Sequence, residues 1–249
     1  MTTNPQALIL YGDGINCEHE TKFALELVGF DTKIMLTSDL FKNPKLIEKY
    51  QLLAFPGGFS FGDEIYSGKV LALQFEQLAK DYLVKFIEQK NIVLGICNGF
   101  QVLVNLGILP DLNYEPMCQL NHNSQNKFIN RWVNLSVNSK LNNPLLKNLT
   151  NFELPIRHGE GNLIIKNEKA SEIILQHAAL FYENDVNGSF AKIAALTNKT
   201  GNVLGMMPHP EAFVTRFQHY NWLNQQIAND QAKPYGYQVF LNAYNYFFC

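Results

Sequence analysis

The 249-residue sequence has little charge and no strong excess of either sign. Charged residues make up 17% of the chain, and the formal net charge at pH 7 is -2. Proteins that bind nucleic acid or an anionic membrane surface usually carry an excess of Lys and Arg. The composition therefore gives no support for nucleic acid or a membrane as a partner.

Several segment types are also missing. No apolar run approaches the roughly 20 residues that span a bilayer, and Met1 to Gln6 lack the basic region of a signal peptide. The four cysteines, at positions 17, 97, 118 and 249, show no C-x-x-C spacing, which argues against a zinc knuckle or a redox pair. We therefore expect a cytoplasmic protein with reduced cysteines and no metal site.

Nucleotide-binding motifs fail at specific positions. Gly12-Asp13-Gly14 begins like a dinucleotide fingerprint, but Cys17 stands where the third glycine belongs. Between Gly62 and Gly68 lie five residues where a P-loop has four, and no Ser or Thr follows Lys69. We therefore expect no cofactor in this chain.

The 47% of hydrophobic residues is enough for a large core. Short apolar runs separated by helical segments predict parallel strands, whereas alternating patterns after about residue 130 predict antiparallel ones. We predict an α/β fold with a mainly parallel central sheet, helices on both faces and an antiparallel strand-rich extension. No linker interrupts residues 1–249, so we expect a single domain. Strands are predicted at 7–11, 32–36, 52–55, 92–96, 131–137, 152–158, 162–165, 190–196 and 203–207, and helices up to Gly29 and at 70–89, 98–107, 169–175, 214–228 and 238–247.

The most informative stretch runs from Ile92 to Gln101. Its pattern predicts a buried strand, a sharp turn at Cys97 and a helix, with Gly95 and Gly99 on either side of the cysteine. This is the arrangement of a nucleophile elbow, with Cys in place of Ser. A helix N-terminus also favours the thiolate form. The alternative is a buried structural cysteine in an ordinary turn.

A second stretch, Pro208-His209-Pro210-Glu211, follows an apolar strand. The prolines favour an extended backbone at His209, and side chains two residues apart in an extended segment lie on the same side. Glu211 can then orient the imidazole. The alternative is a surface histidine in a proline-rich turn.

These elements fit one mechanism. Cys97 is the candidate nucleophile, His209 the general base and then acid, and Glu211 the residue that orients the imidazole. The N–H of Asn98 follows the nucleophile and is one candidate oxyanion donor. The N–H of Gly58 is the other candidate oxyanion donor. The alternative interpretation is that the loop around Gly58 is a plain turn. The chemistry is acyl transfer through a thioester.

Cys97-Asn98-Gly99-Phe100-Gln101, Pro56-Gly57-Gly58 and Pro208-His209-Pro210-Glu211 resemble motifs of the class I (triad) glutamine amidotransferases. The longer stretches 56–63, 95–101, 154–162 and 205–211 are similar to those of the glutaminase subunits of phosphoribosylformylglycinamidine synthase. The resemblance covers about residues 7–216. Arg157, where a small residue is common, departs from the pattern.

The resemblance implies that the chain hydrolyses glutamine to glutamate and ammonia, and that Gln101 helps to hold the substrate. It also implies a synthetase partner, with or without a small accessory subunit, which uses ATP and Mg²⁺ to make formylglycinamidine ribonucleotide in purine biosynthesis. We assign no catalytic role to His158 or Glu160. Two alternatives remain open: a stand-alone cysteine hydrolase of γ-glutamyl substrates, and a non-catalytic interaction subunit.

Overall fold

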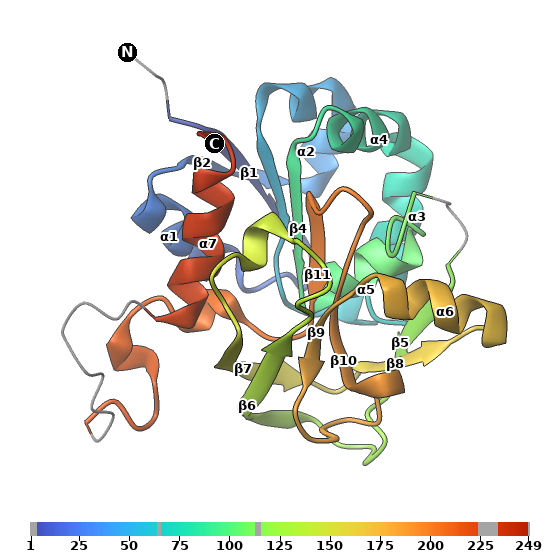
Figure 1. Cartoon of the computed structure of the whole chain (residues 1–249). Helices are drawn as coiled ribbons and strands as arrows, with labels where there is room; N and C mark the ends of the chain where they lie inside the picture. The colour runs from blue at the N-terminus through green and yellow to red at the C-terminus, as the bar shows by residue number, and fades with distance from the viewer. Residues whose placement is uncertain (1–3, 64–65, 113–115, 224–233, 249) are drawn as a thin grey trace.

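A computed structural model describes residues 4–63, 66–112, 116–223 and 234–248 (Figure 1). The strands are β1 (Gln6–Tyr11), β2 (Asp31–Leu36), β3 (Leu52–Phe55), β4 (Ile92–Ile96), β5 (Cys118–Asn121), β6 (Ile129–Val137), β7 (Asn151–His158), β8 (Asn162–Ile165), β9 (Ala178–Tyr182), β10 (Ile193–Thr197) and β11 (Val203–Met206). The α-helices are α1 (Glu18–Val28), α2 (Thr37–Lys42), α3 (Lys69–Leu78), α4 (Lys80–Glu88), α5 (Asn98–Asn105), α6 (Glu168–Gln176) and α7 (Tyr235–Asn245).

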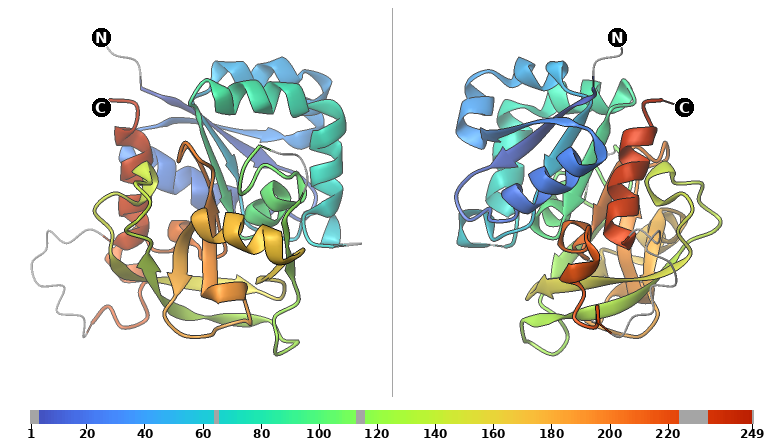
Figure 2. Two further views of the ribbon diagram at one scale, coloured as in Figure 1. Left: turned by 45° about the vertical axis from the view of Figure 1, so that its right-hand side comes forward. Right: turned by 90° about the vertical axis from the view of Figure 1, so that its left-hand side faces the viewer.

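The main sheet has nine strands in the order β2-β1-β3-β4-β11-β10-β9-β6-β7. The five strands from β2 to β11 are parallel, because each is joined to its neighbour by a parallel pairing. Strands β3, β4 and β11 are buried along their whole length, as their apolar sequences predict. Helix α1 contacts β1, β2 and α7, whereas α5 contacts β3, β4 and β11. Figures 1 and 2 show these helices on opposite sides of the sheet, so the predicted two-sided α/β arrangement is confirmed.

The predicted antiparallel extension is confirmed as well. Strands β10, β9, β6 and β7 continue the sheet beyond β11, and every pairing among them is antiparallel. Strands β5 and β8 form a separate two-stranded sheet. The second half of the chain therefore extends the same sheet that the first half begins.

Three adjacent strands position the segments singled out in the sequence. In the parallel register Gly95 of β4 lies opposite Phe55 of β3 and Gly205 of β11. The carboxyl ends of these strands therefore meet at one edge of the sheet, which is where ligands bind in open α/β folds. Residues 56–58 (the glycine loop) follow the end of β3, Cys97 follows the end of β4, and His209 lies three residues after the end of β11.

Some predicted elements were wrong. The helix expected over 70–89 is two helices, because Ala79 leaves the helical conformation at φ -138°. The strand expected over 190–196 begins only at Ile193, after a 3₁₀ turn. Strands β5 and β9 were not predicted. Their short sequences carry no clear period, and they are strands because β8, β6 and β10 pair with them.

The helix predicted over 214–228 is also wrong where the structure describes it. Residues 214–223 contain a 3₁₀ turn, Arg216–Gln218, and no α-helix, while 224–228 lie outside the described residues. The ring of Trp132 packs against Phe213 and His219, with centroids 5.0 and 4.4 Å apart. These tertiary contacts hold the chain in a path that local helix propensity does not predict.

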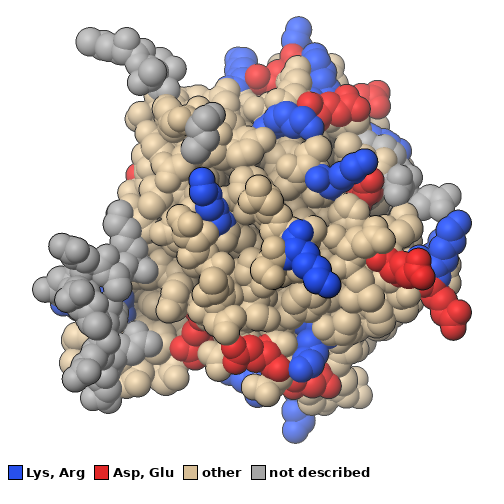
Figure 3. Space-filling model, in the orientation of Figure 1, with Lys and Arg blue, Asp and Glu red and all other residues tan. Residues whose placement is uncertain are grey.

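The helix predicted at 238–247 is confirmed as α7, which contacts α1 and β7. No helix in the described part of the chain is long and apolar enough to cross a membrane. On the face shown in Figure 3, basic and acidic side chains are scattered over a mainly uncharged surface rather than gathered into a basic patch.

Candidate active site

Cys97 stands in a strained turn between β4 and α5. Its backbone has φ 51° and ψ -105°, a combination that side-chain-bearing residues rarely adopt. A β-carbon on Gly99 would lie 1.9 Å from the carbonyl oxygen of Phe55, and one on Gly95 would lie 2.8 Å from that of Gly99. Both glycines are therefore sterically required, and the predicted strand–elbow–helix is confirmed. The Cys97 side chain is buried, with its thiol 3.7 Å from the carbonyl oxygen of Arg157.

His209 and Glu211 form a buried pair beside this turn. Nδ1 of His209 lies 2.5 Å from Oε1 of Glu211, and the two residues are 2% and 1% exposed. His209 has the predicted extended backbone. Glu211, in contrast, lies in the 3₁₀ turn Pro210–Ala212, so the argument from an extended segment was wrong for Glu211 although the two side chains do meet.

Charges around His209 favour its protonated form. Burial alone would lower the pKa of the imidazole, but the charges of Glu211 and Cys97 outweigh it, and the pKa of His209 is raised well above its ordinary value. A protonated imidazole is the form that can give a proton to a leaving group.

Arg157 lies next to the same carboxylate. Its Nη2 is 3.7 Å from Oε1 of Glu211 and 3.5 Å from Oε2 of Glu20. The guanidinium thus partly balances the buried charge of Glu211. The departure from the family pattern at this position is therefore compatible with the pair of His209 and Glu211.

The glycine loop lies on the other side of Cys97. Hydrogen bonds from the N–H of Asn16 to Gly57 O (3.3 Å) and from the N–H of Phe59 to Gly14 O (2.8 Å) lie on either side of Gly58. In such an antiparallel bridge the N–H between the two bonds faces away from the partner segment. The N–H of Gly58 is thus free to face the cavity that Gly58 and Cys97 both line. The N–H of Asn98 is in the first turn of α5, where no intrahelical acceptor exists.

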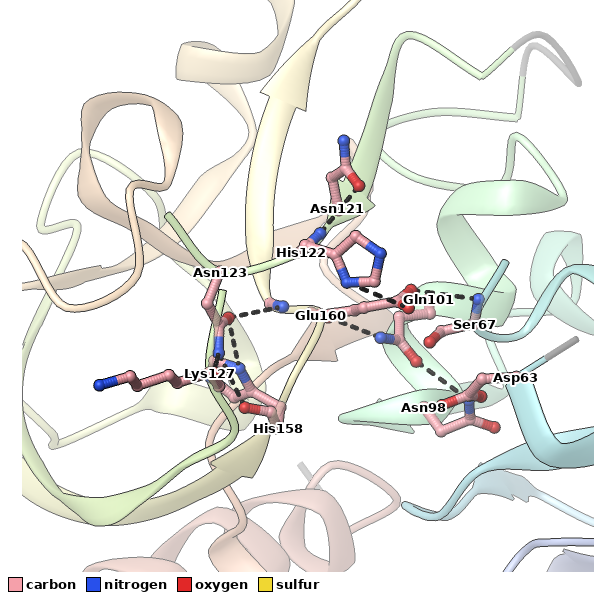
Figure 4. A network of polar contacts seen from close by, with 11 residues as sticks. Asp63, Ser67, Asn98, Gln101, Asn121, His122, Asn123, Lys127, His158 and Glu160 are labelled. Carbon is pink, nitrogen blue, oxygen red and sulfur yellow. Dashed lines mark hydrogen bonds and ion pairs between the residues drawn. The ribbon is translucent and has the colours of Figure 1, made fainter. Parts of the chain in front are cut away.

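The side chains of Asn98 and Gln101 hold the surroundings of the elbow together (Figure 4). Asn98 accepts a hydrogen bond from the N–H of Ser60 and donates to Asp63 and to Gln101 Oε1. Gln101 Nε2 donates to the carbonyl oxygen of Glu160 at 2.6 Å. Both polar ends of Gln101 are thus bonded to protein groups at the wall of the cavity.

A cavity of about 190 Å³ opens beside Cys97. Two carboxylates, Asp63 and Glu160, line it together with Cys97, whereas His209 does not. Burial, together with the charge of Glu160, raises the pKa of Asp63 to about 6. The N–H of Ser67 and the imidazole of His122 lie 3.3 and 3.5 Å from the Glu160 carboxylate. The cavity therefore combines the candidate nucleophile Cys97 with a site that favours a positively charged group.

The chain is similar to known proteins over nearly its whole length. Residues 4–247 match the family model of the CobB/CobQ-like glutamine amidotransferase domain. The chain belongs to this glutamine amidotransferase family. Curated relatives include the phosphoribosylformylglycinamidine synthase subunit PurQ of Methanococcus maripaludis, 34% identical over 98% of each chain, and that of Thermotoga maritima, 35% identical over 84% of this chain and 89% of the relative.

Solved structures agree. A chain in the structure of PurLQS from Thermotoga maritima superposes on this amidotransferase with a TM-score of 0.77 at 30% identity, covering 98% of this chain and 99% of the other. A glutamine amidotransferase from Thermotoga maritima, at 14% identity and a TM-score of 0.56 over 91% of this chain and 83% of the other, shares the fold. The predicted resemblance to the glutaminase subunits is confirmed.

The structure also gives His158 of this amidotransferase a place. Its ring is 2% exposed, with Nδ1 3.0 Å from Oδ1 of Asn123, and a β-carbon on Gly161 would lie 2.3 Å from its Cε1. Burial, followed by the charge of His209, lowers the pKa of His158 to about 3. The ring is therefore neutral near pH 7, and it packs in the turn between β7 and β8, where any side chain at position 161 would clash with it.

Sequence analysis missed Cys17 of this amidotransferase as a member of the site. Its thiol lies next to His209 because the loop after β1 reaches the same sheet edge as the loops after β3, β4 and β11. The rule that carboxyl ends of parallel strands meet at one edge could have drawn attention to this residue.

Proposed function

We propose that this chain is a glutaminase subunit. It hydrolyses glutamine to glutamate and ammonia through a thioester on Cys97, and supplies the ammonia to a synthetase that makes formylglycinamidine ribonucleotide in purine biosynthesis. The observation that carries the proposal is the buried pair of His209 and Glu211 beside a cysteine held in a strained elbow. The PurQ relatives support the choice of pathway.

The first half-reaction forms the thioester. His209 takes the thiol proton of Cys97, and the sulfur attacks the side-chain amide carbon of glutamine. The N–H groups of Gly58 and Asn98 donate to the resulting oxyanion, and each such donor contributes roughly 3 kcal/mol. His209 then gives its proton to the amide nitrogen, the C–N bond breaks, and ammonia leaves.

The second half-reaction restores the enzyme. His209 accepts a proton from a water molecule, whose oxygen attacks the thioester carbon. The C–S bond breaks, glutamate leaves, and Cys97 regains its proton. Glu211 keeps Nδ1 of His209 hydrogen-bonded throughout, which leaves Nε2 to exchange protons with the reacting groups.

The cavity suits glutamine in particular. With the side-chain amide at Cys97, the α-ammonium group extends toward Asp63 and Glu160, the two carboxylates that line the same cavity. Gln101 contributes to substrate binding by holding the backbone of Glu160 and the side chain of Asn98 in place. A substrate without this positive charge would leave the negative charges of the two carboxylates uncompensated.

The partner supplies the remaining chemistry. The similar Thermotoga chain comes from a structure named PurLQS, so we place this chain in a cytoplasmic complex with a synthetase and a small accessory subunit. ATP and Mg²⁺ act in the synthetase. Residues 1–249 serve as one amidotransferase domain.

The test is ammonia release by the purified chain, alone and with the purified synthetase, for wild type and Cys97→Ala. The proposal predicts release that depends on Cys97 and rises when the synthetase and its nucleotide substrate are added. A Cys97-dependent rate that no synthetase changes would support the stand-alone hydrolase. Release that Cys97→Ala leaves unchanged, or no release at all, would overturn the proposal.

A further inference from the structure

Three side chains converge on Gly57, and one of them has no part in the proposed reaction. A β-carbon on Gly57 would lie 2.8 Å from Cε1 of His209, 3.2 Å from Sγ of Cys17 and 3.5 Å from Cβ of Cys97. Donor atoms of Cys17, His209 and Glu211 also lie within 4.8 Å of one another, and all three residues are buried. Cys17 thus places a second thiol at the catalytic histidine.

The imidazole of His209 has a ring nitrogen that could bind a metal ion. Nδ1 of His209 faces Glu211, and Nε2 is buried without a well-formed hydrogen bond among the described residues, while the thiols of Cys17 and Cys97 lie close enough to stabilise the protonated ring. Buried nitrogen atoms without partners are uncommon. A histidine that bonds a carboxylate through one nitrogen, and leaves the other free, has the arrangement that proteins use to ligate metal ions.

We propose that Cys17, Cys97 and His209 form a binding site for Zn²⁺ that reversibly inhibits the enzyme; the inhibition, though not the binding, rests on the proposed function. The ligands are the two sulfur atoms and Nε2 of His209, and Glu211 orients the imidazole. Thiolate and imidazole ligands favour zinc over Mg²⁺ or Ca²⁺. Each thiol releases one proton when it binds the ion.

Two of the three ligands are already close. Bond lengths of about 2.0–2.3 Å in a tetrahedral site place ligand atoms roughly 3.5 Å apart, and donor atoms of Cys17 and His209 lie within 4.8 Å of each other. Cys97 joins by turning its thiol away from the carbonyl oxygen of Arg157. A cavity of about 130 Å³, lined by all three ligands, leaves room for the ion and a water molecule as the fourth ligand.

A search for C-x-x-C spacing could not find this site, because its ligands are far apart in the sequence. Cys17 and Cys97 are 80 positions apart in the sequence numbering, and they meet only because the loops after β1 and β4 share a sheet edge. Zinc bound there occupies both the nucleophile and the base, so the chemistry stops without any change in fold.

The test uses the full chain as wild type, Cys17→Ala and Cys17→Ser, with Cys118→Ala as a matched control for loss of a buried thiol on β5. Zinc affinity is measured by competition with a chromophoric chelator, and Co²⁺ in place of zinc reports thiolate ligation by its absorption spectrum. Wild type and Cys118→Ala are expected to bind one ion. Loss of Cys17 is expected to weaken binding by about 100-fold or more, since even residues behind the ligands contribute 10–100-fold.

Ammonia release provides the second measurement. Zinc is expected to stop release by wild type and Cys118→Ala, a chelator to restore it, and both Cys17 variants to keep their metal-free rate at zinc concentrations that inhibit wild type. Equal zinc affinity and equal inhibition with and without Cys17 would overturn the proposal, provided that both variants melt at the wild-type temperature. The Co²⁺ spectrum decides the site even if no variant releases ammonia, which would count against the proposed function alone.

Discussion

Gly57→Ala tests whether the position of the imidazole limits the reaction. Gly57 does not have the positive φ that would strain an alanine, so only the new β-carbon matters. That atom would lie 2.8 Å from Cε1 of His209, where ordinary contacts are 3.4–4 Å. The buried ring must therefore move by roughly 1 Å, and a displacement of that size can reduce the rate on the order of 10²-fold.

The assay is steady-state ammonia release by the chain with its synthetase. We expect kcat to fall on the order of 10²-fold, and KM for glutamine to change little, because Asp63 and Glu160 line a cavity to which the displaced His209 does not contribute. Gly159→Ala is the matched control, since its β-carbon would meet nothing closer than Phe128 at 3.9 Å. A Gly57→Ala rate equal to that of Gly159→Ala, at unchanged melting temperature, would refute the reasoning.

Three further outcomes are expected. Glu160→Gln should raise KM for glutamine about tenfold at unchanged kcat, because a charge-assisted contact to the ammonium group is lost; unchanged KM in steady-state assays contradicts this. The same assays should show KM rising as the pH falls below about 6, where Asp63 gains a proton, and Asp63→Asn should abolish that change. Since the pKa of His158 is about 3 when folded, lowering the pH from 8 to 5 protonates this residue only in the unfolded form, and its own contribution to the free energy of unfolding should fall by about 2 kcal/mol. The change in the free energy of unfolding between the two pH values, measured by urea denaturation, should therefore be about 2 kcal/mol more unfavourable for wild type than for His158→Gln; an equal change in the two proteins contradicts the assignment.

The parallel part of the fold and the elbow were predictable because their signals are local. Runs such as those of β3 and β4 are apolar throughout, and only glycine fits at positions 95 and 99. The break at Ala79 has no such signal, because neither glycine nor proline marks it. Strand β9 contains helix-forming alanines and is a strand through its neighbours β6 and β10. The prediction of one domain over residues 1–249 stays a prediction.

The candidate site shows the same division. Cys97, His209 and Glu211 lie in motifs with a chemical pattern of their own, so the sequence singled them out. Cys17 lies in no such motif, and Asp63 ends the resembling stretch 56–63 without a role being assigned to it. Both reach the site because loops after β1 and β3 fold toward the same sheet edge, which depends on strand order rather than on any local sequence.

The most direct test of the account is to identify the covalent intermediate. Wild-type chain is mixed with glutamine and its synthetase, quenched in acid, digested and analysed by mass spectrometry, with Cys97→Ala treated in parallel. The account predicts a γ-glutamyl adduct on the peptide that contains Cys97 and none in the variant. An adduct on Cys17 instead, or ammonia release by Cys97→Ala at the wild-type rate, would contradict the central claim that Cys97 is the nucleophile.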